Sequence, residues 1–240
     1  MLEFKNISVS IADTSILKNI SHVFPDGSVT ALLGPNGSGK STLGNTLLGA
    51  PFINVTEGDI LFDGKSILAL APDERARLGI FLSFQSPLPL GGVSAMDLFR
   101  ASLTGKGKMF TPVELHARVH TLAQEIGLDP SFLKRSLYEG FSGGERKKME
   151  ALQAVLYAPK LAIFDEIDTG VDVDALRGIV TFLKKNLPAN ATLIFITHSH
   201  KLLSALAPEH VVVLKKGNIV ATGDKTLADA IEKNGFEQLS

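Results

Sequence analysis

Apolar and polar residues alternate along the first thirty positions of the chain, which is the pattern of half-buried strands. Leu2 and Phe4 begin this alternation, and it continues to Val29. Turn-forming residues interrupt it at 12–13 and at 25–27. We therefore predict an antiparallel strand layer that leads into a buried strand over residues 29–33.

Further runs of aliphatic and β-branched residues predict the central strands of a parallel sheet, because such strands are buried on both faces. These runs cover residues 161–164, 192–197 and 211–214. Residues 57–70 predict two short strands around Asp63-Gly64, and residues 80–84 predict another buried strand. Helices are expected from near Lys40 and over residues 73–78, 142–157 and 174–186.

Residues 86 to about 140 differ in character from the rest of the chain. Leu115, Val119, Leu122 and Ile126 recur at helical spacing after a helix start at Thr111-Pro112, whereas residues 104–108 predict a flexible Gly/Lys loop. The chain thus predicts one α/β domain over residues 1–240, with an N-terminal antiparallel β layer and an inserted α-helical lobe. We expect a core lobe over 1–86 and 156–240 and a helical lobe over 87–155.

Composition narrows the class of protein. The 240 residues are 45% hydrophobic and carry a formal net charge of -1, which gives no bulk attraction to nucleic acid or to an anionic membrane. There is no cysteine, so disulfides and thiolate metal ligands are excluded. The longest apolar runs are far shorter than the roughly 20 residues of a membrane span. We expect a cytoplasmic protein without nucleic-acid partners or direct membrane insertion.

Residues 34–41 read GPNGSGKS, which matches the phosphate-binding loop pattern. Glycines let consecutive amides face phosphate oxygens, and the following helix directs its positive end at the same anion. Lys40 is expected to reach the β and γ phosphates, and Ser41 to bind Mg²⁺. A glycine-rich turn with a solvated lysine is disfavoured by the strand–loop–helix context. The predicted ATP-binding residues are Gly34, Pro35, Asn36, Gly37, Ser38, Gly39, Lys40, Ser41 and Thr42.

Two carboxylates, Asp165 and Glu166, follow the apolar run at 161–164. In open α/β sheets ligands bind at the carboxyl ends of strands. Asp165 is therefore a candidate Mg²⁺ ligand, and Glu166 a candidate catalytic residue that orients and polarises the attacking water. A solvated acidic turn is the alternative, and it loses weight because a phosphate loop lies upstream.

Residues 140–145 (GFSGGE) resemble the signature motif of ATP-binding cassette (ABC) proteins. The resemblance implies a P-loop NTPase fold of the ABC-ATPase type. It also implies that Ser142, Gly143, Gly144 and Glu145 contact ATP held by a second copy of the chain, in a head-to-tail dimer. Ser142 and Glu145 also fit a helix capping box, which is compatible with that role.

Three more residues lie where this family places functional groups. Gln85 resembles the Q-loop glutamine, a Mg²⁺ and water ligand, and His198 resembles the switch histidine, a catalytic residue that contacts the γ-phosphate. Asp172 ends a D-loop-like segment, DTGVD, and is implied to reach across the dimer interface. Ile11 takes the position of the usual adenine-stacking aromatic, which predicts looser discrimination of the base. For His198 the alternative is a structural or exposed residue, which is the usual role of a lone histidine at a strand end.

Longer segments, among them GFSGGERKKMEALQ, FDEIDTGVDVDAL and NGFEQL, resemble the SufC subfamily, the cytosolic ATPases of the Suf iron–sulfur cluster assembly system. That resemblance implies SufB- and SufD-like scaffold partners. The alternative is the ATP-binding subunit of an ABC membrane transporter. A cassette that acts on DNA or ribosomes lacks support, because the chain has neither a long coiled-coil insertion nor a second cassette. A module that holds ATP without hydrolysis is disfavoured by Glu166 and His198.

Overall fold

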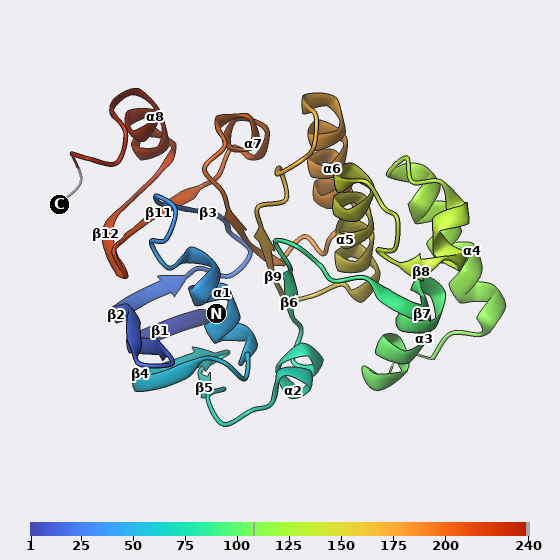
Figure 1. Ribbon diagram of the computed structural model, residues 1–240, viewed down its shortest axis with the longest axis horizontal. Helices are drawn as coiled ribbons and strands as arrows, with labels where there is room; N and C mark the ends of the chain where they lie inside the picture. Colours follow the sequence, from blue (N-terminus) through green and yellow to red (C-terminus); the bar gives the residue numbers. More distant parts are fainter. Residues whose placement is uncertain (108, 239–240) are drawn as a thin grey trace. The chain divides into compact units, whose positions relative to one another are not determined.

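The computed structural model describes residues 1–107 and 109–238 (Figure 1). Lys108 of the predicted Gly/Lys loop, Leu239 and Ser240 lie outside the described residues. The chain forms two compact units. Unit 1 comprises Met1–Leu82, Lys160–Glu166 and the chain from Ala189 onward, and unit 2 comprises Ser83–Pro159 and Ile167–Pro188. The predicted boundaries of the core and helical lobes stay a prediction.

Unit 1 contains the expected antiparallel layer, a four-stranded sheet in the order β2-β1-β4-β5. Its strands are β1 (Leu2–Ile11), β2 (Thr14–Phe24), β4 (Asn54–Phe62) and β5 (Lys65–Ser66). Along β1 the buried residues include Leu2, Phe4, Ile7 and Val9. The alternating pattern in the sequence therefore marks the face of this sheet that packs on the core.

The second sheet of unit 1 has six strands in the order β12-β11-β3-β10-β9-β6. β3, β9, β10 and β11 pair in parallel, which confirms the predicted central strands. The antiparallel edge strand β12 was not predicted. The strands are β3 (Val29–Leu33), β6 (Ile80–Ser83), β9 (Leu161–Asp165), β10 (Thr192–Ile196), β11 (His210–Lys215) and β12 (Asn218–Gly223).

Helix α1 (Lys40–Leu48) lies on the parallel sheet and shares a core with both sheets of unit 1. Leu47 is fully buried in that core, and Gly44 lets the helix approach Leu82 and Ile196 closely. The other helices of this unit are α2 (Pro72–Arg77), α7 (His200–Leu206) and α8 (Lys225–Asn234). The sequence predicted α1 and α2 but neither α7 nor α8.

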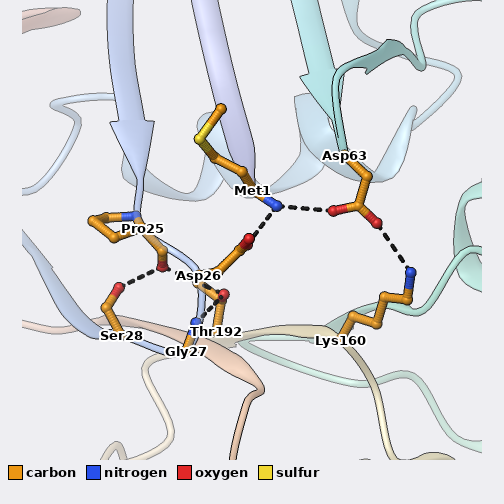
Figure 2. Close-up of polar contacts among 8 residues, drawn as sticks. All are labelled: Met1, Pro25, Asp26, Gly27, Ser28, Asp63, Lys160 and Thr192. Carbon is orange, nitrogen blue, oxygen red and sulfur yellow. Dashed lines mark hydrogen bonds and ion pairs between the residues drawn. The ribbon is translucent and has the colours of Figure 1, made fainter.

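A polar network ties the two sheets of unit 1 together near Met1 (Figure 2). Asp63, in the β4–β5 turn, accepts from the Met1 ammonium at 2.8 Å and from Lys160 Nζ at 3.0 Å. The same ammonium pairs with Asp26. The Gly27 amide donates to Thr192 Oγ1 at 3.0 Å. The loop before β3, the β4–β5 turn and the starts of β9 and β10 are thereby held as one assembly.

Unit 2 is mainly helical, as expected of the inserted segment. Its helices are α3 (Ala95–Gly105), α4 (Pro112–Glu125), the short 3₁₀ helix η1 (Pro130–Lys134), α5 (Gly143–Tyr157) and α6 (Val173–Asn186). Helices α5 and α6 lie side by side (Figure 1). A small two-stranded antiparallel sheet, β7 (Leu90–Ser94) with β8 (Ser136–Leu137), was not predicted.

Helix ends in unit 2 test the sequence predictions closely. Thr111 caps α4 in a capping box with Glu114, which confirms the predicted helix start. The predicted loop at 104–108 is wrong in its first part, because α3 continues through Thr104 and Gly105. Ser94 caps that helix by accepting from the Asp97 amide, and α3 itself was not predicted as a separate helix within the inserted segment. No helix among the described residues is long and apolar enough to cross a lipid bilayer.

Candidate nucleotide-binding site

The loop over residues 34–39 connects β3 to α1. At two of its positions the backbone accommodates only glycine. Gly34 has a φ of 153°, and a Cβ there would lie 2.1 Å from the carbonyl oxygen of Leu214. Gly39 caps α1 with a φ of 105°, and its Cβ would meet Leu17 Cδ2 at 2.7 Å. The loop therefore presses against β2 and β11, and side chains at these positions would push it out of shape.

Lys40 is the first residue of α1 and its side chain is buried in the loop. Its ammonium donates to the carbonyl oxygens of Gly34 at 2.9 Å and Pro35 at 3.1 Å. Burial lowers the pKa of Lys40, while the nearby carboxylates of Glu166 and Asp165 oppose that change. The cation thus lies between the phosphate loop and the acidic end of β9.

The start of α1 provides an electropositive surface for an anion. No acidic residue lies in the first turn of this helix, so its amide dipoles are not neutralised there. Ser38 Oγ is buried and has no hydrogen-bond partner among the described residues. Ser41 and Thr42, which lie in the first turn of α1, are half-buried. This donor-rich cradle suits a phosphate chain.

The acidic pair lies beside this loop in unit 1. Asp165 is the last residue of β9 and is buried. Glu166 has a left-handed backbone, with a φ of 50°, and its amide donates to Ile196 O at 2.9 Å. Because β10 lies between β3 and β9 in the parallel sheet, the carboxyl ends of these strands meet at one edge. Residues more than 100 positions apart in the chain are thereby brought together.

His198 follows β10 at the same edge. Its Nδ1 lies 3.9 Å from Glu166 Oε1, and the side chains of His198 and Glu166 are 55% and 13% exposed. The carboxylate of Glu166 is thus largely enclosed, whereas the imidazole of His198 beside it faces solvent. The geometry of unit 1 thus unites Lys40, Asp165, Glu166 and His198.

The donor set at this edge fits Mg²⁺. Ser41 offers a hydroxyl and Asp165 a carboxylate, and oxygen ligands are those that Mg²⁺ prefers. Across residues 1–107 and 109–238, no group of three or more His, Cys, Asp or Glu side chains forms a metal-binding cluster. Mg²⁺ in nucleotide sites is commonly held by one or two protein groups together with substrate phosphates, for which Ser41 and Asp165 are suitable ligands.

The signature-like segment belongs to unit 2, where Ser142 caps α5. Ser142 Oγ accepts from the Glu145 amide at 3.3 Å, and Glu145 Oε2 accepts from the Ser142 amide at 2.7 Å, which confirms the predicted capping box. Ser142 and Gly143 are exposed, and a Cβ on Gly144 would meet no atom within 4 Å. At Gly143 a Cβ would lie 3.1 Å from the carbonyl oxygen of Gly170, so the helix tip is only partly open within its own unit.

Gln85 and Asp172 also lie in unit 2, and both have roles that the sequence analysis missed. Asp172 caps α6 by accepting from the Ala175 amide at 2.8 Å. Its position directly before a helix was the available signal. Gln85 is exposed, and its carbonyl oxygen accepts from Lys147 Nζ at 3.2 Å. In unit 1, Ile11 ends β1 at the turn before β2 and is half-buried.

Comparisons with known proteins found a family model, curated relatives and solved structures that are similar to this chain. Residues 17–169 match the family model described as ABC transporter. The chain is 44% identical, over its whole length and 95% of the relative, to Probable ATP-dependent transporter slr0075 from Synechocystis. It is 41% identical to Probable ATP-dependent transporter ycf16 from Pyropia yezoensis, covering all of the chain and 98% of the relative. A dimeric bacterial ABC transporter cassette, MJ0796, shares the fold, with a TM-score of 0.81, 22% identity, and coverage of 93% of this chain and 98% of the cassette.

Proposed function

The chain belongs to the ABC transporter family and is an ATP-binding cassette ATPase, and from that premise we propose that its strand-end site binds Mg²⁺·ATP and hydrolyses it. One observation carries the proposal. Unit 1 gathers the cation of Lys40, the carboxylates of Asp165 and Glu166, and the imidazole of His198 around the start of α1. Each of these groups has a distinct use in phosphoryl transfer, which depends mainly on positioning and charge stabilisation.

Binding begins at the phosphate loop. The loop amides and the α1 N-terminus take the phosphate oxygens, and the Lys40 ammonium exchanges its carbonyl partners at Gly34 and Pro35 for the β and γ phosphates. Ser41 and Asp165 would hold Mg²⁺, which when bound neutralises charge on the β and γ phosphates, and the resemblance to ABC proteins implies Gln85 as a further ligand. Ile11 provides apolar contact in place of an aromatic ring for the adenine.

Hydrolysis follows at the acidic edge. Glu166 accepts a hydrogen bond from the attacking water and takes its proton as the oxygen bonds to the γ-phosphorus. The bond between that phosphorus and the bridging oxygen of ADP breaks, and ADP leaves with the bonding electron pair. His198, 3.9 Å from Glu166, contacts the γ-phosphate and keeps the water in line. The products are ADP and inorganic phosphate.

A second copy of the chain completes each site in this proposal. The exposed tip of α5 presents Ser142 Oγ and the amides of Gly143 and Gly144 toward a phosphate held by another molecule. Glu145 orders that tip through the capping box, and Asp172 contributes at the same interface. MJ0796, which shares the fold, is described as a dimer. Two chains would then close head to tail around two ATP molecules.

The biological role we favour is that of a Suf-type ATPase, with a cytoplasmic chain that drives rearrangement of SufB- and SufD-like scaffold proteins during iron–sulfur cluster assembly. Support comes from the segments around the signature motif and the acidic strand end, which resemble that subfamily. The transporter alternative draws support from the names of the relatives, both called probable ATP-dependent transporters. In either role, ATP hydrolysis would drive a conformational change in a partner protein.

Two experiments test these proposals. Phosphate release should fall by about a hundredfold or more in Glu166→Gln while ATP binding persists, and Lys40→Ala should lose ATP binding. Lys185→Ala, on the exposed side of α6, is the control and should match wild type. Substantial hydrolysis by Glu166→Gln would refute the assigned site. Affinity purification from the native host separates the two roles, because soluble scaffold proteins support the Suf role, and a permease recovered only in detergent contradicts it.

A further inference from the structure

A buried ion pair in α5 lies directly behind the signature-like tip, within unit 2. Lys147 Nζ and Glu150 Oε2 are 3.0 Å apart, and the two side chains are only 4% and 3% exposed. Charged side chains are almost never this buried unless they are paired and hydrogen-bonded. None of the steps described above uses either residue.

The pair makes three hydrogen bonds to one short backbone segment. Glu150 Oε1 accepts from the Phe84 amide at 2.8 Å. Lys147 Nζ donates to the carbonyl oxygens of Phe84 at 3.1 Å and Gln85 at 3.2 Å. Two side chains one turn apart in α5 therefore bind both kinds of backbone group in residues 84–85. The anion accepts from an amide, and the cation donates to two carbonyl oxygens.

Side-chain packing does little to fix this segment. Residues 84–86 are all exposed, and the Phe84 side chain is one of the exposed large apolar groups of the chain. The backbone of this segment directly follows the end of β6. The polar contacts from α5 therefore help to hold this backbone in unit 2.

Stability alone is a weak reason for such a pair. Burying two charges costs several kcal/mol, and apolar replacements of buried ion pairs are often neutral or stabilising. What an apolar pair cannot supply is a donor and an acceptor directed at a neighbouring backbone. The contacts of Lys147 and Glu150 therefore indicate positioning.

We propose that Lys147 and Glu150 are positioning residues that lock the backbone of Gln85 to the signature helix, so that Gln85 and the Ser142 tip move as one piece. The inference rests on the proposed function in one respect, the assignment of Gln85 to the Mg²⁺·ATP site. An arrangement of this kind couples the state of the signature helix to the ligand carried by Gln85. Neither residue of the pair touches substrate.

The first test uses the nucleotide-free protein and does not depend on activity. In Lys147→Met/Glu150→Leu, which keeps the volume of the pair, hydrogen exchange at the Phe84 amide should be at least about tenfold faster, the change expected for losing a hydrogen bond to a charged group. Glu125→Gln/Lys185→Met removes an exposed ion pair of the same unit and is the matched control. Wild-type exchange at Phe84 in the apolar variant overturns the inference. Should that variant fail to fold, Lys147→Leu/Glu150→Met, another apolar pair that also removes the acceptor for the Phe84 amide, is judged by the same exchange rate.

The Lys147–Glu150 pair and its three hydrogen bonds to residues 84–85 are called the clamp below. The second test asks whether the clamp acts through Gln85. Gln85→Ala should raise the Mg²⁺ concentration for half-maximal hydrolysis by about tenfold. The apolar pair variant should raise it similarly, and the triple variant should show no further increase. If the increase in the triple variant equals the product of the increases in Gln85→Ala and in the apolar pair variant, the pair does not act by positioning Gln85. Wild-type Mg²⁺ dependence in Gln85→Ala would instead sink the proposed role of Gln85, and exchange at Phe84 would still decide whether the clamp exists.

Discussion

Replacing Arg75 should weaken the helix that carries the phosphate loop, although Arg75 lies far from that loop in sequence. Arg75 is 3% exposed, and its guanidinium donates to four carbonyl oxygens. Nη1 bonds to Thr46 O at 2.9 Å and Leu47 O at 2.8 Å, in the last turn of α1. Nε and Nη2 bond to Leu70 O at 2.9 Å and Leu68 O at 3.0 Å.

These bonds place a cation at the negative end of the α1 dipole, where α1 has no basic residue of its own. In Arg75→Met the buried carbonyl oxygens lose their donors, at about 1–3 kcal/mol each. The two in α1 alone account for about 2–6 kcal/mol. Burial lowers the pKa of Arg75, which shows that burying the charged guanidinium costs free energy, and Arg75→Met removes that cost. We therefore expect the free energy of unfolding to fall by about 3 kcal/mol in total.

The assay is unfolding in urea monitored by circular dichroism, with Arg77→Met as the matched control. Arg77 lies in the same helix, α2, but is exposed and pairs with Asp73 in solvent at 2.7 Å. Its loss should change the free energy of unfolding by no more than about 0.5 kcal/mol. Arg75→Lys should fall between, because an ammonium cannot match a planar fork of donors. If Arg75→Met unfolds within about 0.5 kcal/mol of wild type, the capping argument is wrong.

Other predictions concern the loop and the N-terminal network. Gly34→Ala should abolish ATP binding in a fluorescent-nucleotide titration, because its Cβ would lie 2.1 Å from Leu214 O, whereas Gly37→Ala meets no atom within 4 Å and should cost only about 1–2 kcal/mol of backbone strain. Equal binding by the two variants would contradict this. The Met1 ammonium, and then Lys160, lower the pKa of Asp63 from 3.8, so Asp63 stabilises the fold above that pH and the stabilisation is lost as pH falls through the folded-state pKa. Asp63→Asn should therefore cost at most about 1 kcal/mol at pH 7, with the difference from wild type vanishing in acid unfolding curves. A constant difference down to pH 2 would count against that network.

The sequence predicted the parts of the fold that have a strong local pattern. The buried runs at 161–164 and 211–214 are central parallel strands, and the S-x-x-E spacing at 142–145 is a capping box. The elements that were missed have weaker signals. The short strand β7 contains two glycines and is almost wholly exposed, and α7 has only 7 residues. Alternation and helical periodicity need longer or more buried segments to be recognised.

The candidate site shows the same division between local and tertiary information. The phosphate loop is readable because its residues are contiguous, and its glycines are explained by the close approach of Leu214 and Leu17. The buried charges escaped notice. Lys147, Glu150 and Arg75 lie in helices rich in charged residues, a composition that suggests solvated faces, and only the tertiary structure places them against backbone groups. Burial of a charged side chain depends on partners far along the chain, which no local pattern encodes.

The central claim is that ATP is enclosed between the phosphate loop of one chain and the Ser142 tip of another. Size-exclusion chromatography with light scattering on Glu166→Gln, with ATP and Mg²⁺, measures this directly, with Glu166→Gln/Ser142→Arg as the control that blocks the tip. The account predicts a particle of twice the 25.6 kDa chain mass for the first variant and a single chain for the second. A Glu166→Gln protein that binds ATP yet remains a single chain at high concentration would contradict it.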